Sequence, residues 1–303
     1  MNEPEHQSRN AKTVLLTADK PTGEQPMEFF ITDQHTKYYL AIKSGGDSHR
    51  GLLTGVLAGI GGIGGLGFSL ITALQGNLDY KMLALGVSLF LAPFLWEILR
   101  PLPLPILFNR RTHEVYFDHD GVLFHTPWDG IQAVANEFQL VGPTTGNIQS
   151  ASLEVRVWQF ENPKTSLMVS IGLPFGKSLA MQKSLWEYIR AYMNNGPYFD
   201  EYGKHSESDT FVESQLAVRP KMSDSFKQTI EEIKQAKREM GGKNYLSGHD
   251  IIKLILGAMF YPQDRIQELT YSIAKRRSRN RWPSLVTERL KANGPTTRLV
   301  DLE

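Results

Sequence analysis

Two long apolar runs stand out in the pattern of apolar and polar positions along the chain. No Asp, Glu, Lys or Arg occurs between Arg50 and Asp79, and a second run, 82–99, carries a single charge close to its end. As a helix, residues 52–74 would measure about 35 Å, compared with about 30 Å for the hydrocarbon core of a bilayer. The second run is just long enough for the same core. The pattern predicts a two-helix transmembrane hairpin over 51–100, joined by a short polar loop.

The first run also contains the phrase G-x-G-x-x-G, at Gly59, Gly61 and Gly64, which is typical of dinucleotide-binding loops. Such a loop needs a strand before it, a helix after it and an acidic residue further on. The helix that would follow, 65–74, has only one serine and one threonine as polar positions, whereas a soluble helix needs a polar outer face. A third alternative is a hydrophobic hairpin buried in a soluble core. The pattern favours the membrane hairpin over both alternatives.

Small residues repeat at four-residue spacing in both runs, and such stripes let transmembrane helices approach closely. The stripes consist of Gly55, Gly59, Gly61 and Gly65 in the first run and of Ala84, Ser88 and Ala92 in the second. We expect the two stripes to pack against each other, within one chain or between the chains of an oligomer.

Basic residues flank the two runs on the same side. Lys37, Lys43 and Arg50 precede the first run, Arg100, Arg110 and Arg111 follow the second, and the connecting loop has only Lys81. The positive-inside rule then places both termini in the cytoplasm and the short loop outside. Glu97 is expected at the membrane interface beside Arg100, the alternative being a functional acid inside the bilayer.

Shorter elements are predicted on either side of the hairpin. Residues 1–26 are mostly polar and are expected to be flexible, whereas 27–50 contain two short strands around a polar turn. Residues 101–196 are rich in alternating strands, two of which flank a tight turn at the letters DHDG. This region is predicted to end in an amphipathic helix that starts near Ser178 and stops at Gly196.

The last third of the chain changes to a helical pattern. Residues 197–221 are expected to be a polar linker to a helical domain, 222–303. The first helix of this domain is expected to stop at Gly241. The apolar stretch 249–262 is too short to span a bilayer and is expected in the core or, alternatively, on the membrane surface. Pro262 is expected to begin another helix, and a last short helix follows near the C-terminus.

These elements together predict an α+β membrane protein with a transmembrane hairpin, an antiparallel sheet closed by a helix, and an α-helical C-terminal domain. Antiparallel strands closed by one amphipathic helix, next to a two-span hairpin, resemble the pleckstrin-homology-like domains of bacterial membrane proteins. The resemblance covers 27–196. It implies that strands before the hairpin join the sheet after it, so that the hairpin is an insertion.

Composition narrows the chemistry without identifying a function. The net charge is +1, and the absence of cysteine excludes disulfides, thiol nucleophiles and cysteine-ligated zinc. The N-terminus lacks the apolar core of a cleaved signal peptide. His113, His119 and His125 recur at even spacing, but a DHDG turn would hold them apart, so we expect no metal. The common phrases of hydrolases and nucleotide-binding loops are missing, and we expect neither a cofactor nor catalytic residues.

Four tryptophans outside the hairpin are expected to pack in the core rather than to bind a ligand. They are Trp128, Trp158, Trp186 and Trp282. Aromatic side chains bury a large area each, so packing is their usual role.

The densest group of charges lies near the C-terminal end of the helical region. It consists of Lys275, Arg276, Arg277, Arg279 and Arg281. Such a cluster can bind anionic lipid beside a membrane, meet an acidic protein partner, or be a solvated helix end that complements the helix dipole. A nucleic acid is not the expected partner.

The phrase F-N-R-x-T-x-x-V-Y with a downstream P-W resembles an uncharacterised bacterial family of two-span inner-membrane proteins. The matching residues are Phe108, Asn109, Arg110, Thr112, Val115, Tyr116, Pro127 and Trp128. Genes of this family often lie near type VI secretion effectors, so the resemblance implies a non-enzymatic binding protein, as an immunity or accessory protein for a secreted toxin. The alternatives are a membrane scaffold or anionic-lipid sensor that uses the basic cluster, and an enzyme whose site is assembled from scattered residues.

Overall fold

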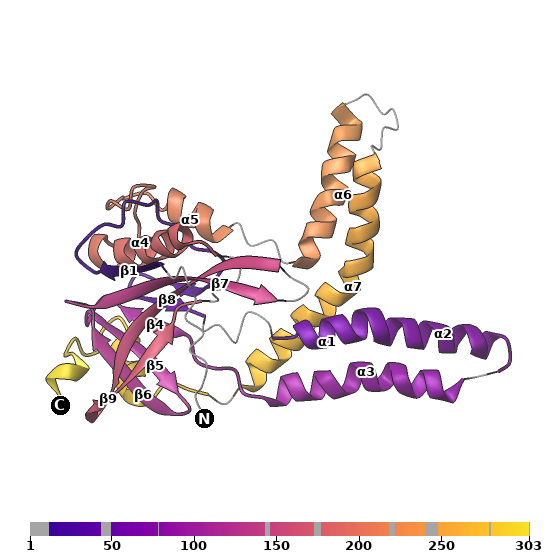
Figure 1. Ribbon diagram of the computed structural model, residues 1–303, viewed down its shortest axis with the longest axis horizontal. Coiled ribbons are helices and arrows are strands. Elements are labelled where there is room, and N and C mark those ends of the chain that lie inside the picture. The colour runs from indigo at the N-terminus through magenta and orange to yellow at the C-terminus, as the bar shows by residue number, and fades with distance from the viewer. Residues whose placement is uncertain are drawn as a thin grey trace. The chain divides into compact units, whose positions relative to one another are not determined.

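The computed structural model describes residues 12–43, 50–77, 79–142, 146–172, 177–217, 222–239, 248–278 and 280–302. Within these residues the fold is α+β, with an antiparallel sheet and a set of helices (Figure 1). The chain forms two compact units, and each unit combines segments that are distant in sequence. The sheet unit comprises Met1–Ser48, Pro103–Val218 and Asn280–Glu303, and the helical unit comprises His49–Leu102 and Arg219–Arg279.

The sheet unit is built on a curled antiparallel sheet. Its strands are β1 (Lys12–Thr17), β2 (Thr32–His35), β3 (Tyr39–Ile42), β4 (Ile106–Asn109), β5 (Glu114–His119), β6 (Val122–Pro127), β7 (Gln132–Gly142), β8 (Gly146–Gln159) and β9 (Asn162–Ser170). The strand order is β1-β7-β8-β6-β5-β4-β3-β2, and β9 pairs with β8. The predicted turn between β5 and β6 is confirmed, since Asp120 and Gly121 have positive φ angles of 51° and 85°, as a two-residue hairpin turn requires.

Strands that precede the two apolar runs pair with strands that follow them. β3 pairs with β4 in antiparallel register, with Ile42 opposite Ile106. The expectation that the hairpin is inserted between neighbouring strands of one sheet is therefore confirmed. The flexible segment predicted over 1–26 is wrong in its second half, because β1 pairs along its whole length with β7. The apolar residues of β1, Val14–Leu16, form a run too short to distinguish a strand from a loop.

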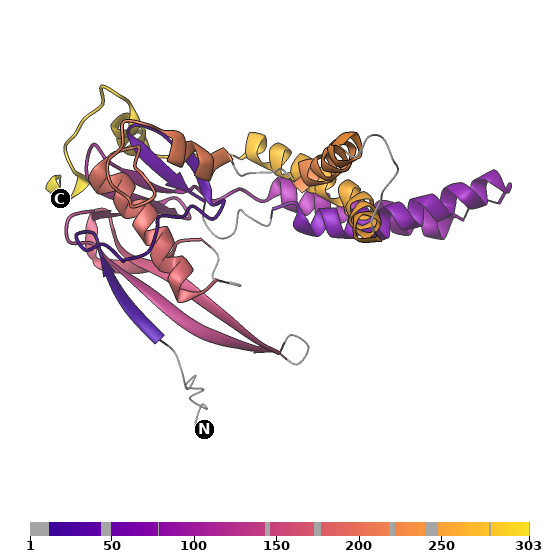
Figure 2. The same ribbon diagram turned by 90° about the horizontal axis from the view of Figure 1, so that it is seen from above.

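Both faces of the sheet are covered. Helix α4 (Leu179–Asn195) packs on one face (Figure 2), and it begins at the Ser178 cap and ends before Gly196, as predicted. The opposite face is covered by α8 (Ser284–Leu290) and the short 3₁₀ helix η2 (Leu299–Asp301), whose Val286 and Leu299 are buried with Leu107 and Tyr116. Because β4 has a cover on both faces, all four of its residues are buried.

Two predictions about the connecting and C-terminal regions are wrong. The expected linker 197–221 contains helix α5 (Thr210–Ala217), and its Phe199 and Val212 are fully buried in the core of the sheet unit. The expected helical domain 222–303 is divided, because Asn280–Glu303 belongs to the sheet unit. Phe199 and Val212 stand among mostly polar residues, so the spacing of apolar residues did not predict their burial.

The helical unit contains two helical hairpins (Figure 1). The first consists of α1 (Leu52–Val56), the π-helical segment η1 (Leu57–Gly62), α2 (Ile63–Leu74) and α3 (Tyr80–Leu99). The second, which we call the arm, consists of α6 (Met222–Glu239) and α7 (Gly248–Arg277). Pro262 lies inside α7 and does not begin a new helix, contrary to the prediction. The helix instead changes direction near its middle (Figure 1), as a missing backbone donor permits.

Candidate membrane hairpin and neighbouring sites

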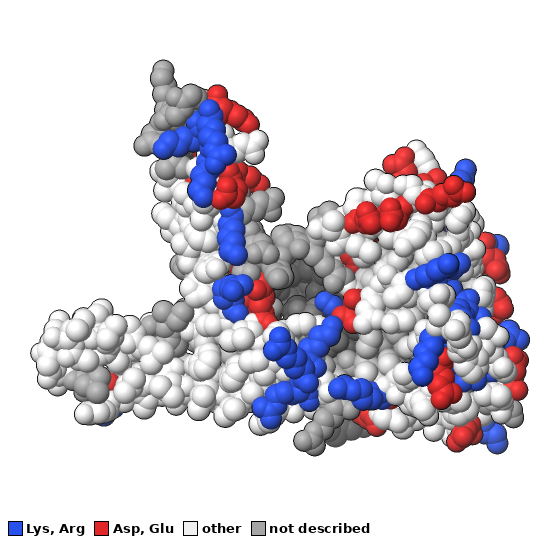
Figure 3. All heavy atoms as spheres, turned by 180° about the vertical axis from the view of Figure 1, so that it is seen from behind, with Lys and Arg blue, Asp and Glu red and all other residues white. Residues whose placement is uncertain are grey.

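The first hairpin exposes the apolar side chains that a soluble core helix would bury. Leu52–Leu74 and Tyr80–Leu99 are long and apolar enough to cross a membrane, yet only 14% and 22% of their most apolar windows are buried. Leu70 is 62% exposed and Leu74 is 81% exposed. The outward surface of this hairpin carries almost no charged side chains (Figure 3). The described chain therefore leaves this apolar surface uncovered.

The serine and threonine hydroxyls of α2 are satisfied within their own helix. The hydroxyl of Ser69 donates to the backbone oxygen of Gly65 at 2.9 Å, and that of Thr72 donates to the backbone oxygen of Ser69 at 3.0 Å. At the tip, the Asp79 carboxylate accepts from the backbone nitrogens of Lys81 and Met82 and so caps α3. Internal satisfaction of polar groups is what a low-dielectric surrounding demands.

The geometry of a dinucleotide loop is excluded at the glycine phrase. Gly59 and Gly61 lie in η1 and Gly64 lies in α2, so the whole phrase is inside one continuous helical segment. A fingerprint loop requires a strand directly before the first glycine and a turn that exposes backbone donors to the pyrophosphate. Here α1 precedes the phrase instead.

The glycines of the first helix serve two different neighbours. A Cβ atom at Gly65 would lie 3.2 Å from the Cα of Gly86 on α3, so the backbones touch at this point. A Cβ atom at Gly59 would lie 2.9 Å from the Cβ of Gln263 on α7, and Gly55 is equally close to that residue. Within this chain only part of the stripe faces the second run, since Gly55 and Gly59 pack on α7. Gly61 lies between these two contacts along the chain.

The predicted stripe on the second helix does not pack against the first helix within this chain. Ala84, Ser88 and Ala92 are exposed. The buried residues of α3 are Gly86, Pro93, Glu97 and Ile98. Residues two positions apart point about 200° apart around a helix, so the predicted stripe lies on the side of α3 opposite Gly86. Small residues occur on several faces of α3, and spacing alone could not select the right one.

A buried carboxylate closes the base of the hairpin. The Glu97 side chain, which is 3% exposed, accepts hydrogen bonds from the backbone nitrogens of Gly51 and Thr54 at 2.9 and 3.0 Å. It also accepts from the Thr54 hydroxyl. These donors belong to the first turn of α1, whose amides have no partner within the helix. Glu97 therefore caps α1 from the end of α3, and it does not lie at the surface beside Arg100 as expected.

Arg50, which directly precedes α1, makes further hydrogen bonds at the same end of the hairpin. Its guanidinium, attached to a residue that is 8% exposed, donates to the backbone oxygens of Glu97 and Pro101 at 3.1 and 3.0 Å. These oxygens lie at the C-terminal end of α3, where the helix leaves carbonyls unsatisfied. Each helix end is thus satisfied by a charged residue of the other helix. We call Arg50, Thr54 and Glu97 the base lock.

The predicted basic cluster is only partly described. Lys275, Arg276 and Arg277 are exposed on the last turn of α7, Arg281 is exposed beyond it, and Arg279 lies outside the described residues. The next residue of the chain, Ser278, donates to the backbone oxygen of Leu102 at 3.5 Å. The last turn of α7 therefore lies beside the exit of α3, where Arg100 is also exposed. Basic side chains gather near this end of the hairpin (Figure 3).

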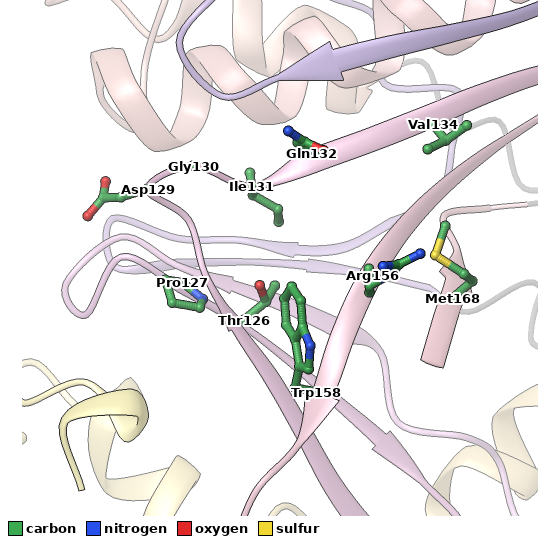
Figure 4. Close-up of a pocket in the computed structure, with 10 residues that line it drawn as sticks. All are labelled: Thr126, Pro127, Asp129, Gly130, Ile131, Gln132, Val134, Arg156, Trp158 and Met168. Carbon is green, nitrogen blue, oxygen red and sulfur yellow. The ribbon is translucent and has the colours of Figure 1, made fainter. Parts of the chain in front are cut away.

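The sheet unit carries a hollow of about 300 Å³ where β6 and β7 separate along the edge of β8. Figure 4 shows the Trp158 indole beside Thr126, and the Arg156 guanidinium beside Met168. Trp158 is 37% exposed, so its predicted core position is wrong, whereas Trp128 and Trp186 are buried as predicted. An aromatic face and a guanidinium are groups that bind ligands. The lining contains one carboxylate, that of Asp129, and neither a histidine nor a lysine.

A second buried polar network holds the C-terminal segment on the sheet. The Glu114 carboxylate is fully buried and accepts from the backbone nitrogens of Leu299 and Val300 at 2.7 and 3.3 Å. It also accepts from the Tyr116 hydroxyl at 2.8 Å, and Nδ1 of His125 lies 3.5 Å away. Sequence reasoning missed Glu114, because a glutamate at the start of a strand is usually a surface residue.

The environment of Glu114 favours its charged form. Burial is the largest single influence and raises its pKa, but the hydrogen bonds from His125, Leu299, Tyr116 and Val300 together outweigh it and hold the pKa below the usual 4.5. Burial and the adjacent Glu114 raise the pKa of the Tyr116 phenol far above its normal range. Tyr116 therefore remains a neutral donor to an ionised carboxylate.

The family-like phrase has a structural explanation in this network. Asn109 donates to the backbone oxygen of Arg289 at 3.1 Å, and the Thr112 hydroxyl lies 2.7 Å from that of Tyr116. Arg111, also within the phrase, donates to the backbone oxygens of Lys291 and Gly294. The phrase thus docks the C-terminal segment. In the part of the chain that the structure describes, no group of three or more His, Cys, Asp or Glu residues is arranged to hold a metal.

Comparisons with protein-family models, with curated proteins and with solved structures found no match to this chain.

Proposed function

We propose that this protein is a non-enzymatic binding protein anchored in a membrane by the α1–α3 hairpin. The observation that carries the proposal is the exposed apolar surface of that hairpin, on which residues such as Leu70, Ile71 and Leu74 are more than half exposed. A bilayer covers such a surface on all sides. The internally bonded serine and threonine hydroxyls of α2 support the same conclusion, because lipid offers them no other partner.

Basic residues at the hairpin base support a cytoplasmic location for both termini. Arg100 and the exposed end of α7 lie on the side of the hairpin opposite its loop, which has only Lys81. The positive-inside rule assigns the basic side to the cytoplasm. The family resemblance adds the bacterial inner membrane as the location.

The sheet unit is the part that we propose to bind a partner. A curled antiparallel sheet closed by α4 supports a pleckstrin-like domain, although a fold alone does not determine a function. The hollow near Trp158 and Arg156 offers an aromatic face and a positive charge, which are groups that bind ligands. The aromatic face and the positive charge support a binding role for this hollow.

Single cysteines test the topology directly, because the natural chain has none. Asn77→Cys places a thiol in the hairpin loop, and Lys164→Cys places one on the exposed end of β9. In intact bacterial cells, a membrane-impermeant maleimide should label position 77 at once and position 164 only after permeabilisation. Labelling of both positions, or of position 164 alone, in intact cells would refute the orientation.

The family resemblance narrows the proposed partner to a secreted toxin or a component of its secretion system. With so little chain outside, an immunity protein of this topology would meet its toxin in the cytoplasm or within the bilayer. Co-expression should therefore protect cells from a cytoplasmic or membrane-acting toxin, with a catalytically inactive toxin as the control. Protection against a purely periplasmic toxin alone would contradict this restriction.

A lipid-sensing function is the second candidate, and it is favoured by the exposure of Lys275, Arg276 and Arg277 beside the hairpin base. Each base near an anionic surface contributes about 1 kcal/mol. Replacing all three by glutamate in the full-length protein should remove bound anionic lipid, measured by native mass spectrometry. Lys237→Glu with Arg238→Glu on α6 is the matched control. If the triple variant retains as much anionic lipid as the control variant, this function is excluded.

A further inference from the structure

The first half of α7 carries an apolar surface that the rest of the helical unit leaves uncovered. Ile251, Ile252, Ile255 and Leu256 are 45%, 57%, 61% and 47% exposed. The prediction that the apolar stretch 249–262 belongs to the core is therefore wrong. A run of large exposed apolar side chains on one helix marks a surface that meets another apolar phase.

This apolar face is centred on the side of α7 opposite α6, and Leu256 and Phe260 at its edge line a hollow that α6 also borders. At 100° per residue, the exposed apolar positions of the first half occupy an arc of roughly 200°. They are Ile251, Ile252, Ile255, Leu256, Ala258 and Phe260. The other side packs on α6, since a Cβ atom at Gly257 would overlap the ring of Phe226, which also lies 5.6 Å from the ring of Tyr261. The arm is thus amphipathic as a whole, with α6 supplying its polar side.

Between its tip and Pro262, the arm carries most of its charges on α6, and Lys253 of α7 borders a hollow that α6 also lines. Lys234 pairs with Glu231 at 2.7 Å on the exposed face of α6, and Lys237 and Arg238 are exposed on its last turn. Figure 3 shows most charged side chains of the arm on the side away from the tip of the α1–α3 hairpin, while the side toward the tip is largely uncharged. An amphipathic element with this division of charge suits a membrane surface.

The orientation of the arm relative to the α1–α3 hairpin is the one that a helix on a membrane surface would have. The first half of α7 extends away from the hairpin, crosswise to α2 and α3, as Figure 1 shows from the side and Figure 2 shows with the arm nearly end-on. Gly55 and Gly59 fix this arrangement through their close contacts with Gln263. If the hairpin enters a bilayer, a helix that crosses it lies in the plane of that bilayer, with its apolar side toward the lipid.

We propose that the arm lies flat on the bilayer, in the leaflet through which the hairpin enters, with the face formed by Ile251, Ile252, Ile255, Leu256 and Phe260 among the acyl chains. This inference rests on the proposed insertion of the hairpin. The occupant of the face is lipid rather than a protein, because the same unit places an apolar hairpin on the same side.

The arm then limits how deeply the hairpin inserts. Beyond the contact of Gly59 with α7, residues 60–74 measure about 22 Å as a helix, compared with about 30 Å for an average hydrocarbon core. With the arm at the surface, the bilayer must thin around the hairpin for the loop to reach the far headgroups. The protein is therefore expected to prefer thin bilayers.

Three single-cysteine variants of the full-length protein test the inference. Ile255→Cys lies on the apolar face, Lys234→Cys lies on the opposite side of the same arm, and Leu70→Cys reports whether the hairpin is inserted. Each is labelled with an environment-sensitive fluorophore and reconstituted in phosphatidylcholine–phosphatidylglycerol vesicles. Quenching is measured with lipids that carry a spin label at a shallow or a deep acyl position, and with aqueous iodide.

Shallow spin-labelled lipid should quench position 255 at least about threefold more strongly than position 234, with the order reversed for iodide, as expected for an interfacial helix. Position 70 should respond to the deep label. If position 70 is in lipid but position 255 responds like position 234, the inference fails and the membrane hairpin stands. If position 255 is shielded from both quenchers, a protein covers the face and the inference also fails. If positions 70 and 255 both respond only to iodide, the proposed insertion fails as well.

Discussion

At the scale of single residues, the base lock shows how charged groups can stabilise an apolar hairpin. Glu97 supplies acceptors to the first turn of α1, and Arg50 supplies donors to the last carbonyls of α3. The two residues lie at the ends of runs that are otherwise free of charge. Their burial fixes where the two helices begin and end relative to each other.

Glu97→Ala should destabilise the hairpin, because it leaves the amides of Gly51 and Thr54 and the Thr54 hydroxyl without their acceptor. A lost set of buried hydrogen bonds to a charged group costs about 2–3 kcal/mol. The free energy of unfolding in detergent, followed by circular dichroism, measures the effect. Glu97→Gln keeps one acceptor oxygen and should lose less. Equal stability of the alanine variant and the natural protein would refute the lock.

Glycines in the first helix differ in what a side chain would meet. Gly65→Leu should separate α2 from α3, because even a Cβ atom there approaches Gly86 to 3.2 Å, and overpacking costs about 1–3 kcal/mol. Gly64→Leu and Gly67→Leu are matched controls, since nothing lies within 4 Å of a Cβ atom at either position. Resistance of the folded hairpin to dodecyl sulfate should fall for the first variant alone. A comparable loss in all three would show that the packing face has been misassigned.

At the scale of elements, the sheet unit is closed by a segment that is distant in sequence. The C-terminal residues 280–302 cover the face of β3–β6 opposite α4, and Glu114 bonds the backbone of that segment. An ionised carboxylate in this position makes the docking sensitive to acid.

The pH dependence follows from the lowered pKa of Glu114. The native state binds fewer protons than the unfolded state, so the stabilisation is fully present above the unfolded pKa of about 4.5 and is lost as pH falls through the folded pKa. Glu114→Gln should cost about 1–3 kcal/mol at neutral pH, and the difference from the natural protein should shrink below pH 4.5. Denaturant unfolding followed by tryptophan fluorescence measures both. A difference that does not change with pH would contradict the role of the charge.

The sequence predicts the elements of this fold better than their partners. The bounds of the apolar helices, the turn at Asp120 and the cap at Ser178 follow from local signals of charge, turn chemistry and capping. The pairing of β1 with β7 and the contact of Gly59 with α7 depend on residues more than a hundred positions away, which no local pattern encodes. The exposed face of α7 has the same periodicity as a core helix, so only the structure separates the two.

At the scale of the whole molecule, the proposed anchor explains why one chain combines a charged, well-packed sheet unit with an uncharged hairpin. The hairpin is inserted between two paired strands, so the sheet unit is tied to it through both connections. A binding surface carried in this way is held close to the bilayer. The hollow at Trp158 could not be predicted from the sequence, because it depends on where β6 and β7 separate along β8.

Alkaline carbonate extraction tests the central claim most directly, because it removes proteins that only lie on a membrane and leaves those with inserted helices. The full-length protein should remain in the membrane pellet after the wash, and so should Ile252→Asp with Ile255→Asp, whose hairpin is intact. Release of the natural protein into the supernatant, as a monomer that needs no detergent, would contradict the membrane hairpin and the function built on it.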